Sequence, residues 1–341
     1  MVHFPGRHVL RGVVVGAFLI LSACTVAPAS QVAQNNPGEH LFDAVLGVVA
    51  TIPDTARTAA SLGTRRIGSG VLINDDGLIL TIGYLIMEAE TAAIISTDGR
   101  TVAADIVAYD HESGFGLLRA REPINAVPLE LGVSKNLPEG APVLAVSFGG
   151  TAGTSTVVPA RVVSRRPFAG YWEYLIENAL FSVPPLKEYG GAALIDGNGR
   201  LIGIGSLMVN DAAPSHRPVI GNMFVPVDLL APVMADLVAT GRRSSPGAPW
   251  LGVRIDEAQG RVFVTRLSTG GPGETAGLKP GDIIIGVNGK RVSGMADYLR
   301  KVRKLGKAGD DIGLDVMPYA ARDLTIQRVV VPSMDRNDWL R

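Results

Sequence analysis

A carboxylate, an imidazole and a hydroxyl lie close together in the sequence at Asp110, His111 and Ser113. Nucleophilic catalysis combines these group types: an oxygen nucleophile, a base that takes its proton, and a carboxylate that orients the base. Adjacent residues of a turn rarely point at one atom, so we expect these three to be solvated turn residues. His40 and His216 lie in polar surroundings, and we expect them at the surface.

Other chemistry-bearing patterns are sparse in the sequence. It contains no cluster with metal-ligand spacing, no phosphate-binding loop and no dinucleotide fingerprint. Gly203 and Gly205 form a Gly-x-Gly pattern, which we interpret as strand glycines. We therefore expect neither a cofactor nor a metal.

The N-terminus has the pattern of an export signal. Arg7 and Arg11 precede the apolar run Val13 to Ile20, which is too short to span a bilayer comfortably. Leu21-Ser22-Ala23-Cys24 follows and resembles the lipobox of bacterial lipoproteins, which implies that Cys24 is lipidated and becomes the mature N-terminus. The alternative is an ordinary cleaved signal with an incidental cysteine. We expect a signal over 1–23 and a lipid anchor to a membrane.

Composition limits the class of protein. The 341 residues suffice for more than one hydrophobic core, and 47% hydrophobic residues with 41 glycines favour β-rich domains. Cys24 is the only cysteine, so no disulfide forms within the chain. The formal net charge is +0, and it becomes about −2 when the signal and its two arginines are removed. This balance gives no electrostatic attraction to nucleic acid.

Shifts in composition divide the rest of the chain. Residues 24–40 predict a flexible tether, and 41–241 predict a domain of short strands separated by turns such as Asn74-Asp75-Asp76-Gly77. That domain ends in a predicted helix over Val227 to Thr240, with Asp228 capping its start and Gly241 its end. A linker at 242–248, a second domain at 249–334 and a tail at 335–341 follow. Strands are expected at Gly70 to Ile73, Leu78 to Thr81, Leu117-Leu118, Val143 to Val146, Val157 to Val163, Val262 to Val264, Ile283 to Ile285, Val287 and Val292.

The first domain resembles the HtrA/Deg branch of trypsin-like serine proteases. The resemblance depends on the order and spacing of several motifs: Gly68-Ser69-Gly70-Val71, Asp76-Gly77, Leu80-Thr81, Asp98-Gly99-Arg100, Leu117-Leu118, Gly190-Gly191 and Phe224-Val225-Pro226. It implies a mostly β fold of two six-stranded barrels, with the active site in the cleft between them.

The positions that match the catalytic triad of that family carry other residues. Tyr84 stands where the resemblance implies a His, and a phenol that titrates at about pH 10 is a poor base at neutral pH. Gly114 replaces the Asp and Gly190 replaces the nucleophilic Ser, while Glu188 puts a carboxylate in the oxyanion loop. We therefore predict a catalytically inactive HtrA-like homologue, a pseudoprotease. An active serine-type endopeptidase that uses unforeseen residues is the alternative.

The second domain resembles the PDZ domains that follow HtrA-type protease domains. Trp250-Leu251-Gly252-Val253 matches the carboxylate-binding loop, and Ala276 to Ile284 matches a second characteristic stretch. The resemblance implies a β-sandwich with one or two helices. A peptide would add a strand in a groove between the strand after Trp250 and a helix over Gly294 to Leu305, with its terminal carboxylate held by backbone N–H groups.

Several roles in this second domain stay open. The basic helix residues Arg300, Lys301, Arg303 and Lys304 are expected to form a solvated face, with attraction of acidic peptides as the alternative. Trp250 either packs in the core or contacts the ligand. The domain as a whole either binds peptides or acts as an internal brace docked on the first domain.

Together these resemblances imply a protein of the cell envelope, on the periplasmic side. It would bind protein C-termini or unfolded segments in protein quality control, or act as an adaptor. A structural lipoprotein with a blocked PDZ groove is a further hypothesis. Relatives often form trimers, which makes a homotrimer the implied oligomer. Thr25, rather than Asp, follows Cys24 and favours the outer membrane.

Overall fold

The structure, a computed structural model, describes residues 40–150, 154–319 and 325–340. The predicted signal, Cys24 and the tether up to residue 39 lie outside these residues. Within the described ranges, no helix combines the length and apolar character needed to cross a membrane.

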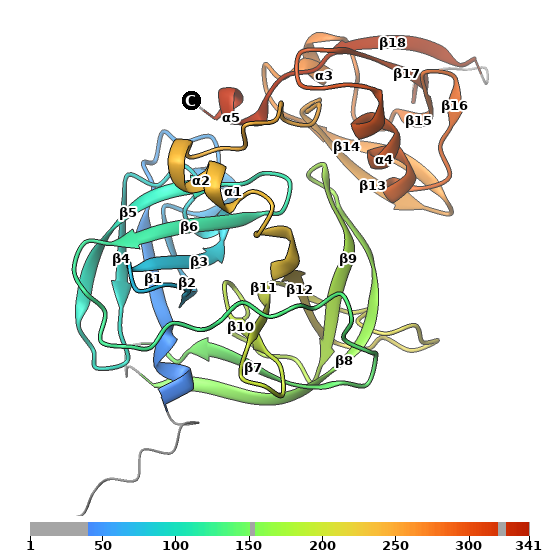
Figure 1. The fold of residues 1–341 in the computed structure, drawn as a ribbon. Coiled ribbons are helices and arrows are strands. Elements are labelled where there is room, and N and C mark those ends of the chain that lie inside the picture. Colours follow the sequence, from blue (N-terminus) through green and yellow to red (C-terminus); the bar gives the residue numbers. More distant parts are fainter. Residues whose placement is uncertain (1–39, 151–153, 320–324, 341) are drawn as a thin grey trace, which may run out of the picture. The chain divides into compact units, whose positions relative to one another are not determined.

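The first barrel closes from strands in the order β1-β2-β3-β6-β5-β4 (Figure 1). Its strands are β1 Val45–Thr51, β2 Arg65–Leu72, β3 Leu78–Ile82, β4 Thr91–Ile95, β5 Thr101–Tyr109 and β6 Phe115–Ala120. Short helical turns accompany them: η1 His40–Ala44, α1 Ala59–Leu62 and η2 Gly83–Leu85. Closure leaves no free sheet edge in the barrel.

The second barrel closes in the order β10-β11-β12-β9-β8-β7. Its strands are β7 Pro142–Phe148, β8 Ser155–Gly170, β9 Tyr174–Val183, β10 Ala193–Ile195, β11 Leu201–Val209 and β12 Gly221–Pro226. The predicted strand Val157 to Val163 is only part of β8, which runs for 16 residues and pairs with β9 as a long hairpin as far as Gly170 and Tyr174. The tip of this hairpin is a turn over Tyr171 to Glu173.

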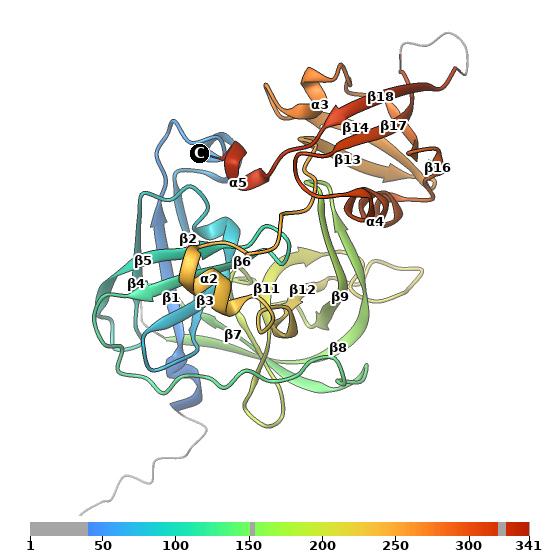
Figure 2. The ribbon, with the colours of Figure 1, turned by 45° about the horizontal axis from the view of Figure 1, so that its top comes forward.

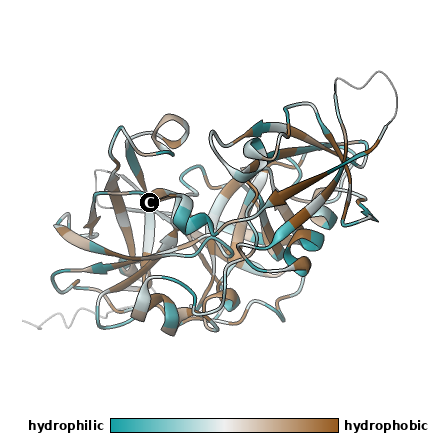
Figure 3. Ribbon diagram, turned by 90° about the horizontal axis from the view of Figure 1, so that it is seen from above, coloured by the Kyte–Doolittle hydropathy of each residue, from teal (hydrophilic) through white to brown (hydrophobic). Residues whose placement is uncertain are grey.

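Local turn chemistry explains why these strands fold back on one another. Between β2 and β3, Asn74 Oδ1 accepts a hydrogen bond from Leu78 N at 2.9 Å, and Gly77 has a φ of +72°, which glycine adopts without strain. Both faces of these strands are covered, since Leu80 and the adjacent residues Leu117 and Leu118 are fully or almost fully buried. Figure 3 shows hydrophobic residues along the barrel strands. The predicted hairpin signals therefore correspond to real strand pairs.

The predicted helix over Val227 to Thr240 was only partly right. The segment forms η3 Val227–Leu229 and α2 Met234–Thr240, because Pro232 lacks an N–H and disfavours helical geometry just before it. Gly241 ends α2 in the left-handed conformation, as predicted, with a φ of +76°. Asp228 is no helix cap: its carboxylate accepts hydrogen bonds from the backbone N and the hydroxyl of Ser134. Helix α2 packs against β5 (Figure 2).

The C-terminal sheet has the order β13-β14-β15-β17-β18, with β16 paired to β15. Its elements are β13 Val253–Ala258, β14 Arg261–Leu267, α3 Pro272–Thr275, β15 Ile283–Val287, β16 Lys290–Arg291, α4 Met295–Leu305, β17 Asp311–Met317, β18 Gln327–Pro332 and α5 Arg336–Trp339. Val292 lies just past β16 and is not a strand residue, contrary to prediction. Buried Tyr298, Leu299 and Val302 attach α4 to the core of this sheet. Two barrels followed by this domain confirm the predicted mostly β fold class.

Candidate active site

A cavity of about 290 Å³ lies where the two barrels meet. Its lining comes from the first barrel, the second barrel, β13 and α5, and includes Tyr84, Gly114, Tyr174, Tyr189, Ser206 and Arg254. Aromatic rings and backbone make up much of this lining. The sequence-predicted triad positions belong to this region, as the contacts of each show.

Tyr84 lies in η2 and is fixed at both ends. Its carbonyl accepts a hydrogen bond of 2.7 Å from the buried guanidinium of Arg66, and its hydroxyl donates to the Ser206 carbonyl at 3.1 Å. Burial raises the pKa of Tyr84 far above its usual range, and the neighbouring Tyr189 adds to the rise. The phenol therefore stays protonated and cannot serve as a base.

Gly190 lies directly beside that hydroxyl. Its carbonyl accepts a hydrogen bond from Ser69 N at 2.8 Å, which ties the segment to β2. A Cβ atom built at Gly190 would lie 2.8 Å from Tyr84 Oη, closer than a carbon and an oxygen normally approach. The Tyr84 hydroxyl thus fills the space in which a side chain at position 190 would begin.

Gly114 is similarly closed in. It has a φ of +79°, and its carbonyl accepts a hydrogen bond of 2.7 Å from Gly83 N. A Cβ atom there would lie 2.7 Å from the hydroxyl of Tyr174, which donates to the Ser113 carbonyl at 2.5 Å. Burial keeps the pKa of Tyr174 well above its usual value. The backbone conformation and this neighbour both favour glycine at the position.

The structure therefore places Tyr84 in contact with Gly190, and links Gly114 to Gly83, the residue before Tyr84. Among the described residues that line the cavity, none is a histidine, an aspartate or a glutamate. Hydroxyls of Thr58, Ser61 and Ser206 are present there, but no imidazole lies beside them to take a proton, and the Thr58 hydroxyl donates to the Glu88 carboxylate at 2.5 Å. Glu188, predicted to disturb the oxyanion loop, is exposed.

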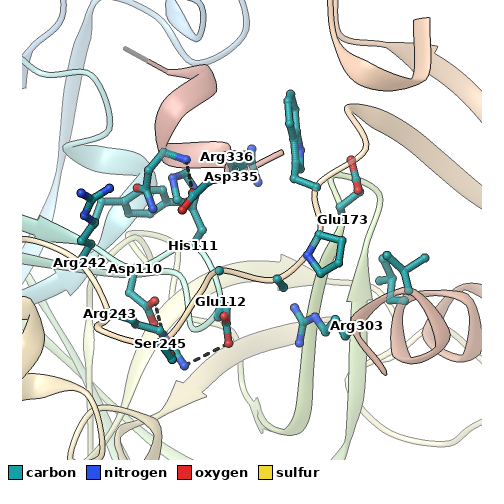
Figure 4. Close-up of a pocket in the computed structure, with 18 residues that line it drawn as sticks. Asp110, His111, Glu112, Glu173, Arg242, Arg243, Ser245, Arg303, Asp335 and Arg336 are labelled. Carbon is teal, nitrogen blue, oxygen red and sulfur yellow. Dashed lines mark hydrogen bonds and ion pairs between the residues drawn. The ribbon is translucent and has the colours of Figure 1, made fainter. Parts of the chain in front are cut away.

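Asp110, His111 and Ser113 do not form the solvated turn that we predicted. Asp110 and Ser113 are buried, and Asp110 makes two hydrogen bonds of 2.7 Å with Arg243, which also reaches Glu112 (Figure 4). Their burial follows from this distant arginine, which local sequence does not reveal. They form no substitute triad either, because the Ser113 hydroxyl donates to Asp110 rather than to an imidazole. Burial lowers the pKa of His111 to about 3, so its imidazole is neutral at pH 7.

The predicted carboxylate-binding loop is occupied by a side-chain carboxylate of the same protein. Glu173, at the tip of the β8–β9 hairpin, accepts hydrogen bonds from Leu251 N at 2.9 Å and from Val253 N at 2.8 Å. Gly252 between them has a φ of +71°. Trp250 is buried, with its ring 5.4 Å from that of Trp339, so it serves packing.

The basic face of α4 was predicted to be solvated, and this is wrong for Arg303, which donates to the Leu175 carbonyl at 3.0 Å. Arg300 lies at the surface, where it binds both carboxylate oxygens of Glu177 at 2.8 and 2.6 Å. Lys301 pairs with Asp297 within the helix, and Lys304 is exposed. The two arginines face β9, which no local pattern in α4 indicates.

Comparison with known proteins matches two parts of the chain. Residues 68–204 match the trypsin-like peptidase domain, and residues 243–317 match the PDZ domain. A "Probable periplasmic serine protease do/HhoA-like" of Haemophilus influenzae is 29% identical over 263 residues, which cover 73% of the chain and 55% of that protein. The periplasmic pH-dependent serine endoprotease DegQ of Escherichia coli is 28% identical over 249 residues, covering 69% and 53%.

Further relatives extend the likeness across both domains. The serine protease PepD of Mycobacterium tuberculosis is 27% identical over 326 residues, covering 89% of the chain and 68% of PepD. The chain spans about half the length of the Haemophilus and Escherichia relatives.

Solved structures share the fold. A structure of the HtrA-type protease AlgW with a decapeptide has a TM-score of 0.55 at 20% identity, covering 88% of the chain and 97% of AlgW. A serine endoprotease from Yersinia pestis has a TM-score of 0.52 at 24% identity, covering 87% and 95%. The two closed barrels and the two family matches show a trypsin-like peptidase domain followed by a PDZ domain, and the relatives that share this order of domains are serine proteases of the HtrA type.

Proposed function

We propose that the protein is a pseudoprotease of the HtrA type, which acts by binding other proteins rather than by cleaving them. The observation that carries the proposal is the contact between Tyr84 and Gly190: a phenol that stays protonated fills the space where a nucleophilic side chain would begin. Gly114 stands at the position of the triad Asp. Thus none of Tyr84, Gly114 and Gly190 offers a group that takes a proton, orients a base or attacks a carbonyl. Loss of a complete triad costs about a million-fold in turnover.

The partners that we propose are protein C-termini and unfolded segments, bound through the PDZ domain. Support comes from the family match over residues 243–317 and from the AlgW structure, which was solved with a decapeptide. Successive N–H groups at Leu251 and Val253 suit a carboxylate, as their bonds to Glu173 illustrate. The biological role would be envelope protein quality control or adaptor binding.

We further propose that lipidated Cys24 anchors the protein to a membrane, with the folded domains on the periplasmic side and the outer membrane preferred. The lipobox-like sequence supports the anchor, and the word periplasmic in the names of the Haemophilus and Escherichia relatives supports the compartment. Mass spectrometry of the mature N-terminus tests this proposal. Acyl chains on Cys24 are expected, and an unmodified terminus after Ala23 would contradict it. A homotrimer remains the proposed oligomer on family grounds.

The competing hypothesis is an active serine endopeptidase, in keeping with the names of the relatives. A fluorophosphonate probe applied to the purified mature protein separates the two, because it labels only activated serines. We expect no specific labelling and no casein hydrolysis. Labelling of any serine, abolished by changing that serine to alanine, would overturn the pseudoprotease.

A structural lipoprotein with a blocked PDZ groove is the second alternative, and one observation favours it: Glu173 already occupies the carboxylate-binding loop. Saturable binding of a C-terminal peptide, lost on amidation of its carboxylate, would exclude this alternative.

A further inference from the structure

The tip of the β8–β9 hairpin makes the contacts that a peptide C-terminus would make in a PDZ groove. The Glu173 carboxylate accepts hydrogen bonds from Leu251 N and Val253 N, on either side of Gly252. Two residues earlier, the Tyr171 carbonyl accepts a hydrogen bond from Ile255 N at 3.0 Å. A side-chain carboxylate here stands in for a terminal carboxylate.

These contacts run in an antiparallel order. Tyr171 and Glu173 are two residues apart, and so are Ile255 and Val253, which they contact in reverse order. The Tyr171 contact joins backbone to backbone, as between antiparallel strands, whereas Glu173 uses its side chain, because Tyr171 to Glu173 form a turn. Peptides that bind by β-augmentation use this pattern of backbone and carboxylate contacts.

The opposite wall of the groove is also taken by the hairpin. Leu175 of β9 is buried within the hydrophobic core of the C-terminal domain, and its carbonyl accepts from Arg303 of α4. Glu177 pairs with Arg300 on the same helix. The hairpin therefore contacts both β13 and α4, the two elements between which we predicted the peptide groove.

The hairpin tip is held in a shape that suits this contact. Glu173 has a φ of +61°, a conformation that costs a non-glycine residue energy and persists where surrounding contacts compensate. Trp172 stacks on Tyr174 with ring centroids 5.4 Å apart, and its carbonyl accepts a hydrogen bond from Arg336 at 3.3 Å. The Arg254 guanidinium lies 5.4 Å from the Tyr171 ring centroid. These contacts present the Glu173 carboxylate to the loop.

We propose that the β8–β9 hairpin tip is a built-in ligand of the PDZ domain, so that a foreign peptide carboxylate binds only by displacing Glu173. The displaced state would free the loop and the β13 edge together, since Tyr171 and Glu173 belong to one turn. The foreign ligand in this inference rests on the proposed function, whereas the internal contact does not.

The first arm of the test needs no peptide. Hydrogen exchange is measured at the amides of Leu251, Val253 and Ile255 in the full mature chain, for the wild type, for Glu173→Ala and for Asn178→Ala. Asn178 is a matched control, because it is exposed on the same hairpin. We expect at least tenfold faster exchange at Leu251 and Val253 in Glu173→Ala, and less than twofold change in the control.

The second arm measures competition. An arrayed library of decapeptides with free terminal carboxylates, each beside its amidated twin, is bound to the wild type and to Glu173→Gln, a variant of similar shape that lacks the charge. We expect at least fivefold tighter binding of free-carboxylate peptides to the variant, with no gain for the amidated twins. Circular dichroism confirms that each variant is folded.

The outcomes separate the inference from the proposed function. Unchanged exchange in Glu173→Ala overturns the built-in ligand, even if peptides bind. Faster exchange without binding of any peptide to either protein supports the built-in ligand and removes the peptide-binding part of the proposed function. Equal peptide affinity of the wild type and Glu173→Gln overturns the displacement.

Discussion

The site between the barrels and the groove of the PDZ domain are both filled by side chains of the same protein, through two different kinds of contact. Between the barrels, the Tyr84 and Tyr174 hydroxyls take the space at Gly190 and Gly114. In the groove, the Glu173 carboxylate takes the place of a ligand on intact N–H donors. The contacts between the barrels fill space beside Gly190 and Gly114, whereas the contact in the groove uses the N–H donors of the loop.

This difference distinguishes a site without catalytic side chains from a binding site that is occupied by a group of the same protein. Gly114 and Gly190 have no side chain and Tyr84 has a phenol that stays protonated, so under the proposed function no conformational change supplies a base or a nucleophile at these positions. The groove retains the Leu251 and Val253 donors, and a competing carboxylate of similar chemistry can replace Glu173 by mass action. We therefore expect substitutions between the barrels to change the free energy of unfolding. Substitutions in the groove should also change the equilibrium between binding of Glu173 and binding of a foreign carboxylate.

The largest effect should come from adding a methyl group at Gly114. Gly114→Ala meets both a positive φ of +79° and the Tyr174 hydroxyl at 2.7 Å, and we expect a loss of about 3 kcal/mol in the free energy of unfolding. Gly99→Ala is the control, because Gly99 has a φ of +83° with nothing within 4 Å of the added atom. The control should lose only about 1 kcal/mol. Urea unfolding measures both, and equal losses would show that Tyr174 does not close the site.

The barrels could be predicted from sequence because their turns are coded locally. Asn74 to Gly77 places a side-chain acceptor and a left-handed glycine where the hairpin needs them, and the apolar runs on either side fill the core. The prediction of one helix over Val227 to Thr240 was partly wrong, because Pro232 interrupts an apolar pattern that otherwise has helical spacing. The positions of Tyr84, Gly114 and Gly190 were available from spacing against the family motifs.

The groove could not be predicted in the same way, because its contacts join distant parts of the chain. Glu173 and Leu251 are separated by 78 residues, and Arg243 lies 133 residues from Asp110, which it buries. Nothing in the sequence around Glu173 marks it as a ligand for a backbone loop. A turn of Tyr, Trp and Glu between long strands is the only local signal, and it becomes informative once β8 is known to reach Gly170.

The next effect is a dependence of stability on pH that comes from the groove. Burial raises the pKa of Glu173 to about 7, against the opposing effect of the backbone N–H bonds and Arg336. The folded state therefore binds a proton that the unfolded state, with its pKa near 4.5, releases. Stability from this group is present at low pH and is lost as pH rises towards 7. Tyr298 also interacts electrostatically with Glu173. The other charged or titratable residues that line the same cavity as Glu173 are Arg303, Asp335, His111, Asp110, Glu112, Arg242 and Arg243.

This dependence is measured as the difference between two proteins. Urea unfolding of the wild type and of Glu173→Gln at pH 5.5 and pH 8.0 should show that acidification stabilises the wild type by about 2 kcal/mol more than the variant. Taking the difference cancels the other titrating groups that both proteins share. An equal response of the two proteins would place the Glu173 carboxylate in water rather than in the loop.

The smallest effect tests whether the Tyr84 hydroxyl is a structural group. It donates to the Ser206 carbonyl, which lies at an irregularity in the pairing of β11 with β12. Tyr84→Phe keeps the ring and leaves that carbonyl without this donor, so we expect a loss of about 1 kcal/mol in unfolding free energy. Tyr319→Phe is the matched control, since Tyr319 is 80% exposed and its hydroxyl should contribute nothing measurable. A variant as stable as the control would mean that the hydroxyl serves some other purpose than bridging the two barrels, and would reopen the site to a chemical role.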